Sequence, residues 1–192
     1  MRTRTILASL SLAGLLALGG CAAERTPSPT PSASGTTGPS ATAEPSPTPT
    51  PSATGTSGLT IACADLVTAQ TAYDWNPNVA AIASHTPAAG SDAARVASLG
   101  GTVCALENLS SGEITEVAAT LLAPQDAVTV RADAAGRGAA SGLGGEGSFA
   151  GTSAWVLVDD GDDAAYWVVV SGPAIVSAAD AAPLAQAAVA AL

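Results

Sequence analysis

The hydrophobic and polar positions divide the chain into three stretches of different character. Residues 6–18 are almost wholly apolar and follow a start that carries Arg2 and Arg4. Residues 25–58 consist almost entirely of Pro, Thr, Ser, Gly and Ala, and contain no large apolar side chain. From residue 59 to residue 192 the apolar positions return at regular spacings. Because a stretch of this length is a normal size for one domain, we expect a single folded domain over 59–192.

Four segments of this domain have the spacing of amphipathic helices. The first is Ile61–Ala72, and the second is Ser91–Leu99 with Ser91 as the expected N-cap. The third is Pro124–Ala135, where proline occupies the first turn, and the fourth is Ala178–Leu192. The pattern therefore predicts about three to four packed helices.

Other segments of the domain have the pattern of strands. Thr102–Asn108 and Glu113–Leu122 predict a hairpin. Ser153–Val158 and Ala165–Ser171 are apolar on both faces, which is typical of central strands that are covered on both sides. Asp159–Asp163 between them is a strong turn signal.

The glycine-rich segment Gly136–Gly151 predicts either a loop or an irregular edge strand. Strands joined by hairpins, with helices kept apart from them in sequence, indicate an α+β fold. We therefore expect an antiparallel sheet of about 4–5 strands packed with about 3–4 helices, preceded by a signal peptide and a disordered linker.

The N-terminal segment has the features of a secretory signal: a basic start, a short apolar core and small residues before a cleavage point. Its apolar run is shorter than the ~20 residues needed to span a bilayer. The sequence Leu18-Gly19-Gly20-Cys21 resembles the lipobox of bacterial lipoproteins. The resemblance implies that residues 1–20 are cleaved and that the sulfur of Cys21 receives a diacylglycerol. An ordinary signal peptide followed by an unrelated cysteine is the alternative.

Acylation would determine where the protein is located. Two acyl chains are enough for stable anchoring, so we expect the mature chain on the outer face of the cytoplasmic membrane, held to the lipid bilayer through Cys21. The proline-rich residues 21–58 then form a disordered tether, because they cannot bury enough surface to offset chain entropy. Whether this stalk is glycosylated or a passive spacer is open.

Composition excludes several functions. The chain has a net charge of −10, six Lys and Arg residues in total, all arginine, and one His. Without lysine there is no phosphate-loop lysine and no Schiff base, and one histidine rules out a multi-histidine metal site. An acidic chain is a poor ligand for nucleic acid. The run Gly142–Gly147 fits a dinucleotide-binding pattern, but a strand rather than a helix follows it, so we expect no cofactor.

Two cysteines remain once Cys21 is lipidated. Cys63 and Cys104 form an even pair in an exported, oxidising setting, which predicts a disulfide. Reactive thiols are the alternative, but the chain has no Cys-x-x-Cys motif to support it.

Catalytic and metal-binding chemistry is sparse. His85 is the only histidine and lies in an expected loop without a serine nucleophile motif, so a surface or capping role is favoured over catalysis. The carboxylates of Asp159–Asp163 favour a solvated turn, with weak Ca²⁺ binding as the alternative. We expect neither an enzyme nor a metal site.

The loop after the first predicted helix is the candidate contact surface. It combines aromatic and hydrogen-bonding side chains, as binding loops often do. The candidate residues are Tyr73, Asp74, Trp75, Asn76 and Asn78. The alternative is that its aromatic rings simply cover the sheet or the disulfide.

The segments Cys63–Asn78 and Cys104–Gly112 are similar to those of uncharacterised actinobacterial cell-envelope lipoproteins, which combine a lipobox, a Thr/Pro/Ser stalk and a two-cysteine domain. The resemblance implies a membrane-anchored lipoprotein. Because the sequence lacks catalytic chemistry, we expect a non-enzymatic interaction module that contacts another envelope protein or the cell wall. A small-ligand-binding lipoprotein accessory to a transport system is the alternative; it predicts a pocket of a few hundred Å³ near Trp75.

Overall fold

A computed structural model describes residues 55–192. Cys21, the expected signal peptide and most of the expected tether lie outside these residues. Within the described part, no helix has the length and apolar character needed to cross a membrane.

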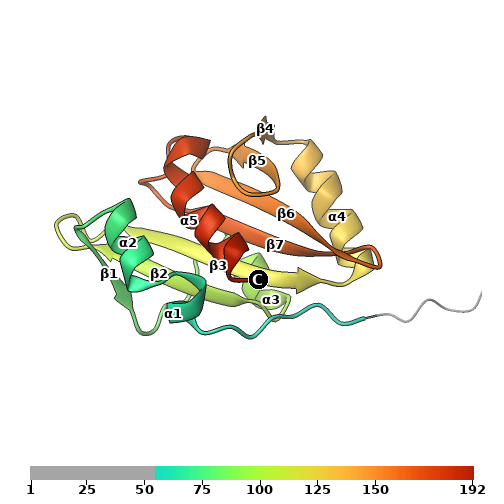
Figure 1. Ribbon diagram of the computed structural model, residues 1–192, viewed down its shortest axis with the longest axis horizontal. Coiled ribbons are helices and arrows are strands. Elements are labelled where there is room, and N and C mark those ends of the chain that lie inside the picture. The colour runs from blue at the N-terminus through green and yellow to red at the C-terminus, as the bar shows by residue number, and fades with distance from the viewer. Residues whose placement is uncertain (1–54) are drawn as a thin grey trace, which may run out of the picture. The chain divides into compact units, whose positions relative to one another are not determined.

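A seven-stranded antiparallel sheet organises the domain (Figure 1). Its strands lie in the order β1-β2-β3-β7-β6-β5-β4. The bounds are β1 Val79–Ile82, β2 Thr102–Asn108, β3 Ile114–Leu122, β4 Gly138–Ala140, β5 Glu146–Ala150, β6 Ser153–Gly161 and β7 Ala164–Ser171. The chain thus builds two meanders, β1-β2-β3 and β4-β5-β6-β7, which join where β3 pairs with β7.

Five helices flank the sheet. Their bounds are α1 Cys63–Leu66, α2 Ala69–Trp75, α3 Asp92–Ser98, α4 Pro124–Ala135 and α5 Ala178–Ala190. Local sequence explains where several of them begin. The side chains of Thr68 and Ser91 accept backbone N–H bonds at the starts of α2 and α3, and Pro124 occupies the first turn of α4.

Each face of the sheet carries its own hydrophobic core. On one face, α1, α2 and α5 pack on strand residues that include Leu106, Val117 and Val168. On the other, α3 and α4 cover a second cluster around Trp155 and Trp167. Figure 1 shows α2 and α5 lying across the first face. The sheet is therefore the middle of three layers, which is why its central strands are apolar on both sides.

The expected α+β class and antiparallel sheet are confirmed, but the strand and helix numbers are wrong. Residues 55–192 form seven strands instead of about 4–5, and five helices instead of about 3–4. The expected helix Ile61–Ala72 is interrupted, because Val67 and Thr68 take extended backbone angles between α1 and α2. The Thr68 side chain then caps a new helix, so two short helices replace one.

The additional strands come from segments with weak sequence signals. β1 has only four residues, two of them alanine, and therefore little strand propensity. The glycine-rich Gly136–Gly151 forms β4 and β5, so one of its two expected outcomes, the edge strand, is present as β4. The expected turn after β6 is confirmed: Asp162 and Asp163 both have positive φ, as a two-residue hairpin turn requires.

Candidate functional site at the disulfide edge

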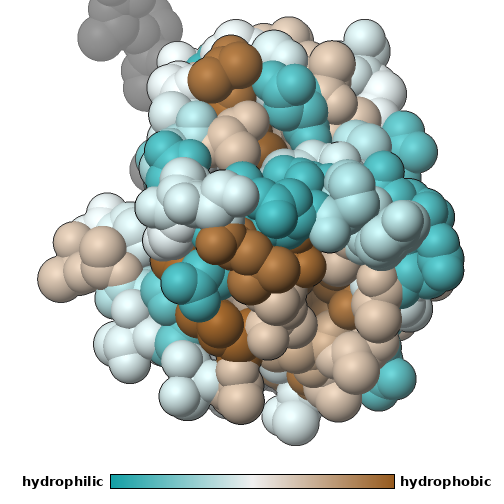
Figure 2. Space-filling view, turned by 90° about the vertical axis from the view of Figure 1, so that its left-hand side faces the viewer, coloured by the Kyte–Doolittle hydropathy of each residue, from teal (hydrophilic) through white to brown (hydrophobic). Residues whose placement is uncertain are grey.

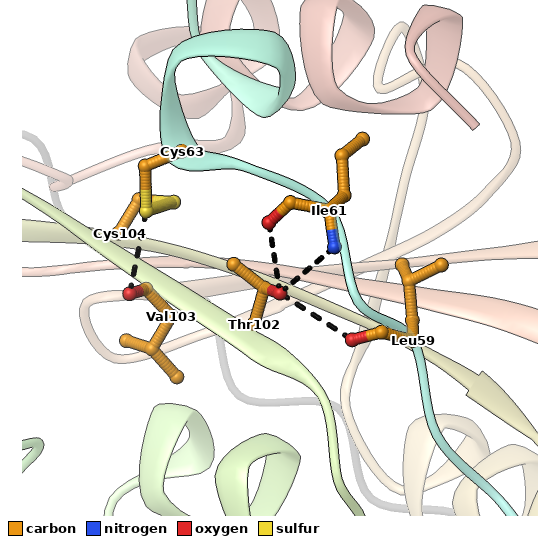
Figure 3. Close-up of a disulfide and its surroundings, with 6 residues drawn as sticks. All are labelled: Leu59, Ile61, Cys63, Thr102, Val103 and Cys104. Atoms are coloured by element: carbon orange, nitrogen blue, oxygen red, sulfur yellow. Dashed lines mark hydrogen bonds between the residues drawn. A yellow bond between two sulfur atoms is a disulfide. The ribbon is translucent and has the colours of Figure 1, made fainter.

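The predicted disulfide is present and joins α1 to β2 (Figure 3). The Cα atoms of Cys63 and Cys104 are 5.4 Å apart, and the two residues are 41 positions apart in sequence. Cys104 is buried, whereas Cys63 is exposed. The bridge therefore ties the segment that enters the domain to the sheet beneath it.

Hydrogen bonds hold the same entering segment beside the bridge (Figure 3). The hydroxyl oxygen of Thr102 accepts the backbone N–H of Ile61 at 3.3 Å and lies 3.3 and 3.1 Å from the carbonyl oxygens of Leu59 and Ile61. The hydroxyl proton can donate to one of these carbonyls at a time. One polar side chain of β2 thus fixes the backbone that leads into α1.

Beside the disulfide lies a hollow of about 450 Å³ between α1, α2 and the edge strand β1. We call it the edge hollow. Its lining residues are Cys63, Ala64, Val67, Ala69, Ala72, Val79, Ala80, Ala81, Ile82, Ala83 and Leu106. None of these described side chains ionises, since Cys63 is in the disulfide. Figure 2 shows the end of the molecule that carries α2 and β1, where hydrophobic atoms gather in a patch bordered by hydrophilic ones.

Small side chains create the edge hollow. Six of its eleven lining residues are alanine, and an alanine methyl group does not fill the gap that a leucine would close. Val67 and Leu106 are buried and belong to the core, whereas Ala80 and Ala81 of β1 are exposed. The hollow is therefore an apolar recess that opens to the surface along a strand.

The strand beside the hollow has one free edge. β1 pairs with β2 on one side, and no strand among residues 55–192 pairs with its other side. Unpaired backbone N–H and C=O groups along an edge strand are a template for pairing with another chain. An apolar recess and a free strand edge thus adjoin each other at the same end of the sheet.

The predicted contact loop lies next to this hollow, but its first three residues, Tyr73–Trp75, belong to the end of α2 instead of a loop. Trp75 is held inside the fold. Its indole N–H donates to the carbonyl oxygen of Asp180 in α5 at 2.9 Å, and its ring packs on the first core. Tyr73 projects outward with 61% of its surface exposed. Asp74 is also exposed and accepts a hydrogen bond from Gln70 at 2.7 Å. Trp75 therefore fastens α2 to α5.

The two asparagines of the loop organise backbone and a neighbouring hairpin. Asn76 ends α2, and its side-chain oxygen accepts the backbone N–H of Asn78 at 2.9 Å. The side-chain amide of Asn78 donates to Asn108 and Ser110 at the β2–β3 turn. The candidate loop is thus a brace that positions α2 and β1, the two elements on either side of the edge hollow.

The remaining sequence candidates lie elsewhere. His85 contacts Glu116 at 2.6 Å on the face covered by α3, and the other carboxylate oxygen of Glu116 accepts from Ser171 at 3.3 Å. Within the described residues there is no group of three or more acidic, cysteine or histidine side chains placed to hold a metal ion. The Asp159–Asp163 carboxylates belong to the β6–β7 hairpin and its tip.

A second hollow, of about 390 Å³, lies between α4 and the strands β4 to β6. Its most buried charged group is Arg137, which is already engaged. The guanidinium carbon lies 4.1 Å from the ring centre of Trp155, and one nitrogen donates to the carbonyl oxygen of Ser153 at 2.7 Å. Burial lowers the pKa of Arg137, and the nearby Asp92 carboxylate opposes that shift. These contacts hold α3 and the β4 region against the sheet.

Comparison of the chain with protein-family models, curated proteins and solved structures gave no match. The edge hollow therefore has to be interpreted from its own geometry. Sequence reasoning missed it, because Val79–Ile82 is too short and too rich in alanine to be identified as a strand. The apolar character of these four residues, directly after a proline-containing turn, was the available signal.

Proposed function

We propose that this protein is an exported, lipid-anchored binding module of the cell envelope, and that the edge hollow is its binding surface. The observation that carries the proposal is an apolar recess of about 450 Å³ beside a free strand edge, walled by a disulfide-linked helix. This surface suits recognition by packing and backbone pairing. It offers no ionisable group among its described lining residues with which to catalyse a reaction.

The location follows from the N-terminal sequence. Acylation of Cys21 would anchor the chain, and the proline-rich segment would hold the domain away from the bilayer, where another envelope protein or the cell wall can reach it. The Cys63–Cys104 disulfide supports an exported setting, since disulfides persist in oxidising compartments.

The size of the hollow also favours a second candidate function. A volume of this order, beside the helix that carries Trp75, suits a small apolar molecule. In that case the protein would be a small-ligand-binding lipoprotein accessory to a transport system. A protein segment is favoured because the recess is continuous with a strand edge that a small molecule would leave unpaired.

Crosslinking of the membrane-anchored protein in intact cells, followed by mass spectrometry, tests the proposal. Ala81→Arg places a long charged side chain at the edge hollow. Ala139→Arg is the matched control, because Ala139 is an exposed alanine on β4, the opposite edge strand. We expect a reproducible partner that Ala81→Arg removes and Ala139→Arg retains. Equal recovery of partners from both variants would contradict the proposal.

A further inference from the structure

We infer that the edge hollow takes an extended segment of another protein in which apolar and basic residues alternate. This inference rests on the proposed function and specifies the chemistry of its partner. The inference rests on the observation that an apolar recess adjoins a free strand edge, and that the elements forming them bear carboxylates and no arginine.

The acidic groups belong to the elements that build the hollow. Asp65 follows the lining residue Ala64 in α1, and Asp74 lies in α2. Glu107 follows the lining residue Leu106 in β2 and pairs across the ladder with Ala80 of β1. Strand alternation puts Glu107 on the sheet face opposite to Leu106, whereas α1 and α2 lie on the same face as Leu106. A partner that docks along β1 therefore meets carboxylate-bearing elements on both faces of this sheet edge.

Among residues 55–192, Asp65, Asp74 and Glu107 form no ion pair with a basic side chain. In the described residues the ion pairs are His85–Glu116, Arg95–Asp133, Arg131–Asp159 and Arg137–Asp92. The three arginines among residues 55–192 lie in α3, in α4 or just before β4. Residues 55–91 and 102–122, which form α1, α2, β1, β2 and β3, contain no arginine, and the chain has no lysine. Positive charge that complements this end of the sheet must therefore come from outside these residues.

The geometry of a strand edge specifies the form of the partner. A chain that pairs with β1 alternates its side chains between two directions. Alternate residues can therefore point toward the recess, while their neighbours point away from it. Burial of an apolar side chain in the recess favours binding, and the basic neighbours add charge complementarity that speeds association and excludes acidic competitors.

Peptide binding to the purified full chain tests the inference, with fluorescence anisotropy as the measurement. The probes are three short peptides of equal length, in which valine alternates with lysine, with serine or with glutamate. We expect the lysine peptide to bind at least about tenfold more tightly than the serine peptide, and the glutamate peptide not to bind. Added salt should weaken the binding of the lysine peptide more than that of the serine peptide.

Two sets of variants locate the interaction. Ala81→Arg should abolish binding and Ala139→Arg should not. The triple variant Asp65→Asn, Asp74→Asn, Glu107→Gln should weaken the lysine peptide about tenfold. A second triple variant at the β6–β7 turn removes the same number of charges far from the hollow and should leave binding unchanged. Its substitutions are Asp160→Asn, Asp162→Asn and Asp163→Asn.

The outcomes separate the inference from the function on which it rests. If the lysine and serine peptides bind equally and Ala81→Arg blocks both, the charge inference is overturned while the apolar docking surface stands. If both triple variants weaken binding equally, the lysine peptide is attracted by the overall negative charge of the protein and not by the carboxylates near the edge hollow, and the inference is overturned. If no peptide binds and sedimentation shows a dimer that Ala81→Arg disrupts, the occupant is a second copy of this chain. If nothing binds and Ala81→Arg changes no crosslink in cells, both proposals fail.

Discussion

Reduction of the Cys63–Cys104 disulfide should destabilise the domain strongly. The bridge spans 41 residues. For a loop of this length the chain-entropy relation gives an entropy difference of about 13 cal/mol/K in the unfolded state, or about 4 kcal/mol at 25 °C. A loss of this size lowers the melting temperature of a domain of this length by roughly 10–15 °C.

The measurement is thermal unfolding, followed by circular dichroism, of the full chain with and without a reductant. The chain carries Cys21→Ser so that only the bridge responds. A matched variant with Cys63→Ser and Cys104→Ser should melt near the reduced protein and ignore the reductant. The reasoning would be refuted if reduction changed the melting temperature by less than about 3 °C, or if the double serine variant responded equally.

The same perturbation should also weaken the proposed binding surface. Cys63 and Ala64 of α1 line the edge hollow, and the bridge fixes α1 on β2. Reduction of the disulfide releases α1 from β2, whereas the strands beneath α1 keep their hydrogen-bonded pairing. At a temperature where the reduced protein is still folded, binding to the edge hollow should therefore fall more than the helical circular-dichroism signal does.

Four further results are expected, the first three measured by urea unfolding. Gly101→Ala should lower the free energy of unfolding by more than about 2 kcal/mol, because the new Cβ would lie 2.5 Å from a carbonyl oxygen of β3. Gly136→Ala should leave it almost unchanged, and equal effects of the two substitutions would contradict the packing argument. Asp92→Asn should lower the free energy of unfolding by about 2–3 kcal/mol, since the partly buried Arg137, an indole N–H and a hydroxyl all face this carboxylate. A decrease below about 0.5 kcal/mol would contradict that. Trp75→Phe should lower the free energy of unfolding by about 1 kcal/mol, because the indole N–H bond is lost, and it should retain the crosslinks to the partner. Loss of these crosslinks in a folded variant would show that the binding surface lies at Trp75 instead of the edge hollow. In cell fractionation, Cys21→Ser should move the protein from the membrane to the soluble fraction, and unchanged membrane association would exclude the lipid anchor.

The long elements could be predicted from sequence because their signals are local. Thr102–Asn108 has the bounds of β2 and Pro124–Ala135 those of α4. In each case the apolar spacing, a turn or a proline specifies the element within a few residues. The apolar runs of β6 and β7 also indicated correctly that these strands are covered on both faces.

The short elements could not be predicted because neighbouring strands determine them. β1 gains its strand conformation from pairing with β2, and β5 from pairing with β6. Gly147 shows why propensity fails there: an added Cβ would collide with the backbone of Ala140 on β4, so glycine allows the close approach of the strands. Tertiary pairing at these positions overrides the weak strand propensity of alanine and glycine.

The candidate site was predictable only in part for the same reason. The disulfide is predicted because Cys63 and Cys104 are the two cysteines that remain once Cys21 is lipidated, and it is confirmed. The residue types of Tyr73–Asn78 predict a binding loop, yet Trp75 belongs to α2 and contacts a residue of α5 that is 105 positions away, which no local pattern indicates. The edge hollow depends on what alanines leave unfilled between α2 and β1, and sequence alone does not locate an unfilled volume.

Site-specific photo-crosslinking in intact cells tests the central claim most directly. A photoreactive amino acid replaces Ala81 at the edge hollow or, as the control, Ala139 on the opposite edge strand of the same anchored chain. The account predicts a discrete adduct with one envelope protein from position 81 and none from position 139. Matching adducts from both positions, or none from position 81 in a folded protein, would contradict it.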